Sequence, residues 1–322
     1  MAVLPFDAPP IIQSAPASGE LVLQIQNLTK KYGTRIAVNQ LSLSVARGEV
    51  FGFLGPNGAG KTTTIRMLLN LIRPTSGEVL LFGERLTDAP QRLLPRVGAL
   101  IEQPSFQTYL SGRDNLIAAG GYTGGVAESR IDEVLALVGL ATRGEDRYAT
   151  YSLGMRQRLG VGAALLTDPE LIILDEPGNG LDPAGIVEMR DLIRTLAQRG
   201  KTIFVSSHIL AEIRQVCTRI AILRNGKLIA AGPVDNLLQT TVRWEVEMRA
   251  NAEQVRDLVA AQPGVRGATV ENGIVSIDAP GSQGSQLIHF LAQHNIWPES
   301  VRRSEEDLEH IFLRLTEKEA GL

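Results

Sequence analysis

The chain has 322 residues, of which 44% are hydrophobic, so it is long enough for about two globular domains. Its formal net charge of −3 favours neither nucleic acid nor an anionic membrane surface as a main partner. Cys217 is the only cysteine, which excludes a disulfide within one chain and a cysteine-based zinc site. We expect Cys217 to be a small core residue in a reducing compartment.

The first 20 residues predict a flexible extension, because prolines interrupt them and they lack the basic start of a secretory signal. No segment of the sequence predicts a membrane span. The longest uncharged stretch near the necessary length is Ala279 to Pro298, and it is rich in Ser, Gln, Gly and His. Leu21 to Val50 alternates apolar and polar residues, which predicts antiparallel strands.

A glycine-rich loop follows next along the chain. Val50 to Leu54 predicts a short buried strand and Ile65 to Leu71 a helix, and between them a loop suited to phosphate binding is expected. Lys61 would contact β- and γ-phosphates and Thr62 would ligate Mg²⁺, whereas the alternative is a glycine turn with a chance Lys-Thr pair. The residues of this loop that we expect to bind nucleotide are Gly55, Pro56, Asn57, Gly58, Ala59, Gly60, Lys61, Thr62 and Thr63.

Two further segments precede the next strand. Gln103 follows the apolar stretch Val97 to Ile101. Ser152 and Gly154 open a predicted helix from Met155 to Thr167, which makes a second N-terminus suited to an anion. Taken alone, that segment would be read as a plain helix cap.

Leu171 to Leu174 is an unbroken apolar run, as expected for a parallel strand buried on both faces. Asp175 lies at its carboxyl end, where ligands bind in open α/β sheets, and is predicted to hold Mg²⁺. Glu176 is then placed to deprotonate an attacking water. The alternative for these adjacent acids is a solvated loop.

His208 follows a predicted strand from Thr202 to Ser206, and taken alone it favours a structural role. Tyr32 could likewise be an ordinary tyrosine at a strand end. Ile220–Leu223 and Leu228–Ala231 flank Asn225-Gly226 and predict a hairpin that closes the core.

The C-terminal part predicts a small α+β domain in the order strand, helix, strand, strand, helix, strand, which is the ferredoxin-like pattern. A closing amphipathic helix is expected from Glu305 to Thr316. The expected elements before it are Val242–Arg249, Ala252–Ala261, Ala268–Glu271, Ile274–Asp278, Ser285–His294 and Ser300–Arg303.

The ordered set of motifs from about Leu21 to about Pro233 resembles the ATP-binding cassette (ABC) family, in its transporter ATPase subunits. The resemblance implies an α/β fold: a phosphate-loop core with an antiparallel β subdomain and a helical subdomain. It implies that Tyr32 stacks on adenine, that Gln103 touches Mg²⁺ and the attacking water, and that His208 bonds the γ-phosphate. By the same resemblance Ser152 and Gly154 cap the ATP of a second copy, and the loop containing Asp182 touches that copy.

Three positions depart from the usual family pattern: Leu153 replaces a glycine, Met155 replaces a glutamine and Gly178 replaces a threonine. Ser152 and Gly154 are intact, so a working site is expected. Intact Glu176 and His208 argue against a scaffold that no longer hydrolyses ATP.

The expected domains are the extension at 1–20, the ATPase at 21–238 and the accessory domain at 239–322. The resemblance implies a dimer, a separate permease and a place at the cytoplasmic membrane face. The Glu306–Leu313 run and the Gln103–Gly112 segment resemble bacterial drug, bacitracin and lantibiotic exporters, so export is favoured. The alternatives are an ABC ATPase without a permease and an importer subunit.

Overall fold

The computed structural model describes residues 19–102, 104–239, 242–265, 267–279 and 284–305. The chain divides into two compact units between Gly232 and Pro233, and each is described by itself. The sequence placed the domain boundary after residue 238, and that boundary stays a prediction.

The centre of the N-terminal unit is a six-stranded sheet with the order β10-β9-β3-β8-β7-β6. Five of its strands, β9-β3-β8-β7-β6, are parallel to one another, and every residue of β3 and β7 is buried, as their continuous apolar runs predict. The strands are β3 (Val50–Leu54), β6 (Val97–Leu100), β7 (Leu171–Asp175), β8 (Thr202–Ser207), β9 (Arg219–Arg224) and β10 (Lys227–Pro233).

A second, antiparallel sheet of four strands has the order β2-β1-β4-β5. The sequence predicted strands between Leu21 and Val50 but did not identify β4 and β5. The strands are β1 (Leu21–Tyr32), β2 (Arg35–Ala46), β4 (Ser76–Leu81) and β5 (Glu84–Arg85).

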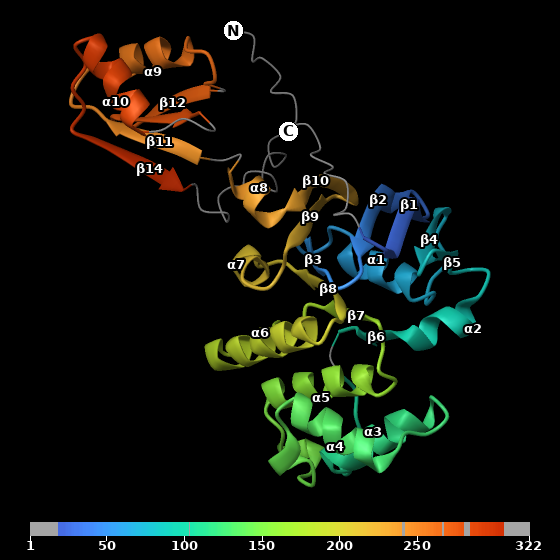
Figure 1. The fold of residues 1–322 in the computed structure, drawn as a ribbon. Helices are drawn as coiled ribbons and strands as arrows, with labels where there is room; N and C mark the ends of the chain where they lie inside the picture. The colour runs from blue at the N-terminus through green and yellow to red at the C-terminus, as the bar shows by residue number, and fades with distance from the viewer. Residues whose placement is uncertain (1–18, 103, 240–241, 266, 280–283, 306–322) are drawn as a thin grey trace. The chain divides into compact units, whose positions relative to one another are not determined.

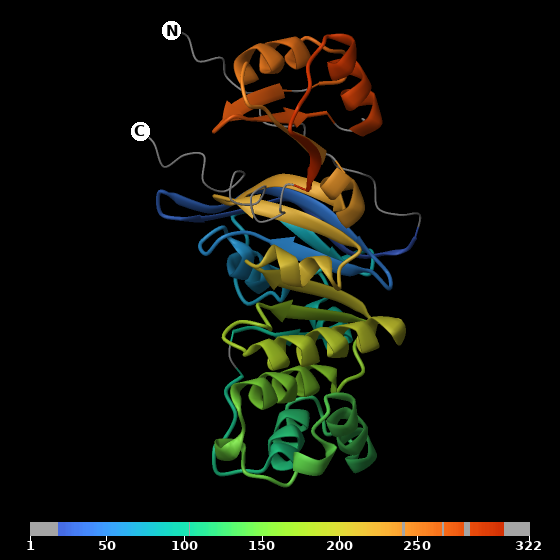
Figure 2. The same cartoon turned by 90° about the vertical axis from the view of Figure 1, so that its left-hand side faces the viewer.

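Helices cover both faces of the six-stranded sheet. In Figure 1, α1 lies between the two sheets, and α6 and α7 cover the other face of the six-stranded sheet. Figures 1 and 2 show α3, α4 and α5 gathered beyond its β6 edge, as the predicted helical subdomain requires. The helices are α1 (Lys61–Leu68), α2 (Pro90–Leu93), α3 (Gly112–Gly121), α4 (Glu128–Leu137), α5 (Leu153–Leu165), α6 (Pro183–Gln198) and α7 (Leu210–Arg214).

Two predicted helices begin earlier than expected. The helix after the glycine loop begins at Lys61 rather than Ile65, directly after the left-handed Gly60 (φ 106°). The helix after Ser152 begins at Leu153 rather than Met155, because the Ser152 hydroxyl caps it by accepting from Met155 N at 3.2 Å. The sequence did not identify α6, although the pair Asp182-Pro183 is a strong start signal.

Helix α5 packs unusually close to β6 because glycines line the contact. A Cβ atom added at Gly98 would lie 2.1 Å from the Ala164 carbonyl oxygen. One added at Gly160 would lie 2.9 Å from Leu100 and from Pro104. Any larger side chain at Gly98 would therefore push the helix away from the sheet.

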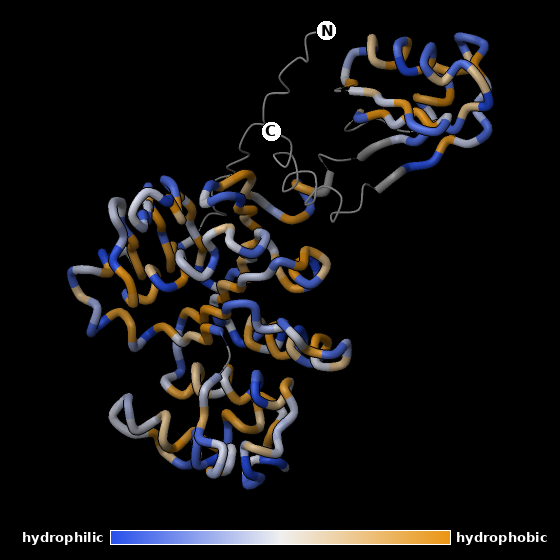
Figure 3. Tube along the Cα trace, turned by 180° about the vertical axis from the view of Figure 1, so that it is seen from behind, coloured by the Kyte–Doolittle hydropathy of each residue, from blue (hydrophilic) through white to orange (hydrophobic). Residues whose placement is uncertain are grey.

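One hydrophobic core joins the two sheets and α1. Figure 3 shows the hydrophobic segments gathered at the centre of the N-terminal unit. Phe204 is fully buried there, with its ring 5.7 Å from that of Phe51 and 5.1 Å from that of Phe53. Cys217 is also buried, as predicted, and burial raises the pKa of its thiol.

The C-terminal unit contains a four-stranded sheet with the order β12-β13-β11-β14, and its paired strands are antiparallel. From β11 to β14 the element order is the predicted one, whereas the preceding α8 was not predicted, and the assignment to the ferredoxin-like class stays a prediction. Glu305 ends β14, and the rest of the expected helix to Thr316 lies outside the described residues. The elements are α8 (Val234–Gln239), β11 (Val242–Glu247), α9 (Ala252–Ala260), β12 (Gly267–Glu271), β13 (Ile274–Asp278), α10 (Gly284–Gln293) and β14 (Ser300–Glu305).

Replacing Phe204 with Ala should lower the free energy of unfolding of the N-terminal unit by about 3–5 kcal/mol, because it leaves a cavity between two aromatic rings. Chemical denaturation followed by circular dichroism measures this. Tryptophan fluorescence does not, since Trp244 and Trp297 both lie in the C-terminal unit. The exposed Tyr122 is the control, and its replacement by Ala should change the value by less than about 0.5 kcal/mol.

Candidate functional site

The site forms where three neighbouring parallel strands end. Strand β8 lies between β3 and β7, with Leu54 of β3 opposite Ser207 and Asp175 of β7 opposite Ser206. The residues that follow these strands therefore meet at one edge of the sheet. The register brings the glycine loop, Glu176 and His208 together, as the sequence predicted.

The glycine loop holds its shape through left-handed glycines. Gly58 and Gly60 have φ of 81° and 106°, and a Cβ at Gly60 would lie 2.5 Å from the Ala37 carbonyl oxygen. Helix α1 begins here without a side-chain cap and without an acidic residue in its first turn. An uncapped helix N-terminus with inward N–H groups fits an anionic phosphate.

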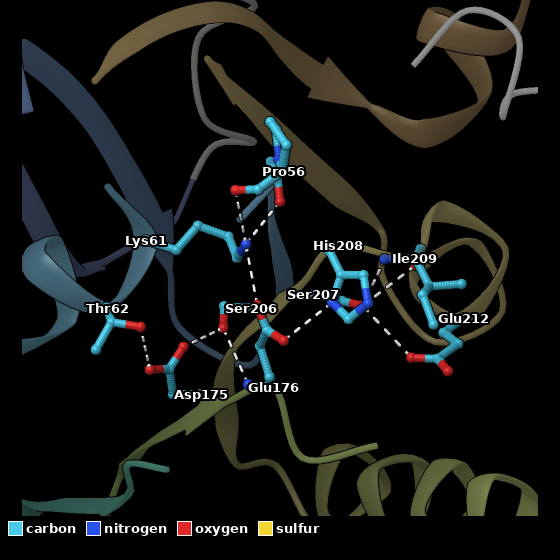
Figure 4. Close-up of polar contacts among 11 residues, drawn as sticks. Pro56, Lys61, Thr62, Asp175, Glu176, Ser206, Ser207, His208, Ile209 and Glu212 are labelled. Atoms are coloured by element: carbon cyan, nitrogen blue, oxygen red, sulfur yellow. Dashed lines mark hydrogen bonds and ion pairs between the residues drawn. The ribbon is translucent and has the colours of Figure 1, made fainter. Parts of the chain in front are cut away.

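Lys61, Glu176 and His208 form a continuous chain of polar contacts (Figure 4). Lys61 Nζ lies 3.0 Å from Glu176 Oε1, and Glu176 Oε2 lies 2.9 Å from His208 Nδ1. Lys61 also donates to the carbonyl oxygens of Gly55 at 2.6 Å and Pro56 at 3.3 Å. The side chain of Lys61 is only 4% exposed, so these partners must replace the water that its ammonium group has lost.

Asp175 lies beside this chain and is 5% exposed. Its Oδ2 atom accepts from the Thr62 hydroxyl at 2.7 Å, and its Oδ1 atom accepts from the Ser206 hydroxyl. Thr62 and Asp175 thus offer two adjacent hard oxygen donors, which fit Mg²⁺. Gln103, the third predicted ligand, lies outside the described residues.

The backbone at Glu176 is left-handed, with φ 49°. Such a conformation is uncommon for a residue other than glycine and persists only where the surroundings hold it. Ser206 supplies that support, because its hydroxyl and carbonyl oxygens accept from Glu176 N at 3.0 and 3.2 Å. Ser206 therefore anchors both adjacent acids.

The Ser152 segment is exposed at the start of α5 and contacts the loop that begins α6. A Cβ at Gly180 would lie 3.3 Å from Leu153 Cδ2, so the unusual Leu153 packs on this loop. A Cβ at Gly154 would lie 3.9 Å from Leu181 Cδ2. Asp182 caps α6 by accepting from Gly185 N at 2.9 Å.

The remaining predicted residues lie at the margin of the site. Tyr32 ends β1 and is 49% exposed, with Lys30 Nζ 5.1 Å from the centre of its ring. Its exposed face leaves room for a stacking base. Asn57 is exposed, Ala59 is buried, and Thr63 lies in the first turn of α1.

Phe106 and Tyr148 connect the segment after Gln103 to the start of α5. The ring of Phe106 meets that of Tyr148 edge-on at 5.3 Å, and the Tyr148 hydroxyl donates to the Pro104 carbonyl oxygen at 3.1 Å. Arg156 of α5 lies 5.2 Å over the Tyr148 ring. Phe106 is therefore part of a local core, whereas Tyr109 is 71% exposed.

A groove of about 640 Å³ opens near α2 and the end of α3. Tyr122, which is 93% exposed, forms part of its wall. The lining residues are Asn70, Pro90, Gln91, Leu94, Pro95, Tyr122, Thr123 and Thr167.

Sequence reasoning did not single out Ser206, Ser207 or Glu212. Ser206 and Ser207 end a buried strand immediately before His208, and polar residues at that place were the available signal. Nothing in the sequence marks Glu212, because its proximity to Gly178 depends on the tertiary fold.

Replacing Ser206 with Ala should lower the free energy of unfolding by about 1–3 kcal/mol, because the buried Asp175 Oδ1 loses its donor and the Glu176 N–H keeps only its bond to the residue 206 carbonyl oxygen. ATP turnover should fall as well, since Glu176 loses one of the two bonds that anchor it. Chemical denaturation and a phosphate-release assay measure the two effects. Replacing the exposed Ser105 with Ala is the control, and an equal loss there would refute the anchoring role of Ser206.

Comparison with known families and proteins agrees with this geometry. The family model described as ABC transporter matches residues 38–179. The bacitracin transport ATP-binding protein of Bacillus licheniformis is 40% identical over 91% of this chain and 97% of its own length. The lantibiotic transport ATP-binding protein of Streptococcus pyogenes is 40% identical over 65% of this chain and 89% of its own.

Solved structures show the same fold. The structure of an ATP-binding subunit of an ABC transporter is 30% identical, with a TM-score of 0.60, over 67% of this chain and 91% of that one. An ATP-binding cassette bound to ADP and phosphate, 24% identical with a TM-score of 0.60, shares the fold. The chain therefore belongs to the ABC transporter family, as an ATP-binding subunit that couples ATP hydrolysis to transport.

Proposed function

We propose that the chain hydrolyses ATP with Glu176 as general base and, as a dimer, powers export through a separate permease. The observation that carries the residue roles is the chain of contacts from Lys61 through Glu176 to His208 at one sheet edge. Such a chain joins a phosphate-binding cation to a carboxylate and to a hydrogen-bonding imidazole, which is what phosphoryl transfer to water needs.

Lys61 and the N–H groups at the start of α1 bind the β- and γ-phosphates. Lys61 pairs with Glu176 at 3.0 Å, so the γ-phosphate competes with Glu176 for the ammonium group. As Lys61 turns to the phosphate, the Glu176 carboxylate becomes able to accept a proton from water. Tyr32 stacks on the adenine ring.

His208 acts with Glu176 at the γ-phosphate. Its Nδ1 atom lies 2.9 Å from Glu176 Oε2, so the carboxylate fixes the orientation of the ring. We propose that a ring nitrogen of His208 bonds the γ-phosphate and the attacking water. His208 holds these groups, and Glu176 takes the proton.

Thr62 and Asp175, with Gln103, are the residues that would hold Mg²⁺. When bound, the ion supplies positive charge that neutralises the phosphate oxygens. Ser206 contributes by keeping the Asp175 carboxylate in place. In this proposal Thr62, Asp175 and Gln103 orient the substrate through the ion, and Ser206 keeps Asp175 in position.

A second copy of the chain completes each site. Ser152 and Gly154 form another N-terminus suited to an anion, on α5 rather than on α1. Ser152 is exposed, as a residue that contacts a nucleotide on another subunit must be. The loop containing Asp182 lies against this segment and touches the second copy as well.

Export of a drug, peptide antibiotic or lipid-like compound is the transport that we propose. Its support is the similarity, over nearly the whole chain, to a protein named for bacitracin transport. None of the helices in the described part of the chain combines the length and apolar character needed to cross a bilayer. We place the protein at the cytoplasmic membrane face through its permease.

The groove near α2 and, separately, the exposed Tyr109 before α3 are the two places that we propose for docking of that permease. The groove is concave and partly apolar, and Tyr122 and Tyr109 present large exposed rings. Exposed rings of this kind anchor protein interfaces. A cytoplasmic helix of the permease is the occupant that we propose.

Replacing Glu176 with Gln tests the chemistry. ATP turnover should fall by about 10²–10⁴-fold, the usual contribution of a positioned general base. ATP should still bind and hold a dimer, which light scattering detects. Replacing the exposed Glu128 with Gln is the control and should leave turnover unchanged. Parent-rate turnover in the Glu176 variant would show that another residue is the base.

Replacing Tyr109 and Tyr122 together with Ser tests these two docking places. In cells that also make the permease, the share of protein in the membrane fraction should fall about tenfold or more, because interface aromatic anchors dominate affinity. ATP binding should persist. Replacing Val187, an exposed apolar residue of α6, with Ser is the control for lost surface hydrophobicity and should leave membrane association unchanged. Unchanged membrane association of the double variant would argue against both places.

The C-terminal unit is proposed to support the dimer. It has its own hydrophobic core around Val246, Val275 and Ile277. A chain ending at Leu238 should therefore keep ATP binding but dimerise more weakly, as sedimentation with the Glu176→Gln background would measure. Loss of ATP binding by a folded truncated chain would contradict the boundary after residue 238.

A further inference from the structure

Glu212 of α7 lies on the side of Ser207 away from the glycine loop and is half-buried. Its Oε2 atom lies 3.4 Å from the Ser207 hydroxyl oxygen, which also accepts from Ile209 N at 2.9 Å (Figure 4). The hydroxyl has one hydrogen, and the Ile209 carbonyl oxygen lies within its reach at 3.3 Å. A charged acceptor forms the stronger bond, so the carboxylate influences which way this hydroxyl turns.

Gly178 faces the same carboxylate from the loop after Glu176. A Cβ at Gly178 would lie 3.2 Å from Glu212 Oε2 and 3.5 Å from Oε1. A small cavity of about 30 Å³ adjoins both residues, which is room for about one water molecule. Residue 178 therefore determines how much space the Glu212 side chain has.

Glu212 is poorly solvated for a carboxylate. Burial raises its pKa, while the bond from Ser207 and the charges of His208 and Arg190 act in the opposite direction. Glu176, which also carries negative charge nearby, adds to the rise. Keeping a carboxylate partly out of water costs folding free energy, which favours a functional role for Glu212 over simple packing.

We propose that Glu212 is a positioning residue for His208, that it acts through the Ser207 hydroxyl, and that Gly178 sets the room for its carboxylate. Ser207, His208 and Ile209 are consecutive, and the hydroxyl binds the backbone on the far side of His208. Fixing that hydroxyl fixes the backbone from which the His208 ring reaches Glu176. This inference rests on the proposed role of His208.

Replacing Glu212 with Ala should lower kcat about tenfold, comparable to the lower end of the cost of losing a hydrogen-bond partner that orients a metal-ligating side chain. The KM for ATP should stay within about twofold, because Glu212 does not touch the glycine loop. Replacing Glu212 with Gln should keep kcat within about threefold of the parent, since the amide oxygen still accepts from Ser207. A structural role alone would instead lower the melting temperature and the amount of folded protein in step with activity.

Residue 178 provides a second, independent test. Replacing Gly178 with Ser should change kcat by about threefold or more in the parent, and should change it by less than about 1.5-fold when Glu212 is Ala. Gly121, where an added side chain meets open space, is the control for a Gly→Ser change. Equal effects of Gly178→Ser in both backgrounds would overturn the proposal.

The outcomes separate this inference from the proposed function. If His208→Ala keeps parent turnover, the proposed role of His208 fails and the inference falls with it. If His208→Ala is inactive while Glu212→Ala has parent kcat, the inference alone fails. Should Glu212→Ala not fold, Glu212→Asp with and without Gly178→Ser decides in its place, because the shorter side chain withdraws the carboxylate from both Ser207 and residue 178.

Discussion

The N-terminal unit must provide partners for one buried positive charge, that of Lys61. The ammonium group of Lys61 is almost fully removed from water and is held by two carbonyl oxygens and by Glu176. An unpaired charge at that depth would cost several kcal/mol, so the loop and the end of β7 must meet. The parallel register of β3, β8 and β7 brings them together, and the fold of the N-terminal unit can be understood as the frame that maintains this register.

Much of the fold could be predicted because the local signals agree with one another. Continuous apolar runs gave β3 and β7, and Asn225-Gly226, both left-handed, gave the β9–β10 turn. Strands β4 and β5 were not identified, since Ser76–Leu81 is short and lies beside glycine and proline, and its pairing with β1 is non-local. The start of α1 was placed too late because the turn at Gly60 already begins the helix.

The sequence allowed the candidate site residues to be named, but it did not predict which neighbouring side chains hold them in place. Lys61, Asp175, Glu176 and His208 each occupy a recognisable place next to a strand. The supporting contacts of Ser206 and Glu212 depend on strand order, because β8 lies between β3 and β7 only in the folded sheet. The packing of Leu153 on Gly180 likewise joins segments that no sequence pattern relates.

Because α5 packs closely on β6, a small tilt of the helix about these contacts would move its N-terminal end. Its close contacts with β6 and Pro104, at Gly160 and Ala164, lie in its C-terminal half, whereas Ser152 precedes its N-terminal end. At about 1.5 Å of rise per residue, Ser152 lies roughly 12–18 Å along the helix from Gly160 and Ala164. A tilt of about 10° would thus displace its hydroxyl by roughly 2–3 Å, comparable to a hydrogen-bond length. A modest reorientation of the helical subdomain is therefore sufficient to make or break the nucleotide contact that we propose for Ser152, without any unfolding of the helix.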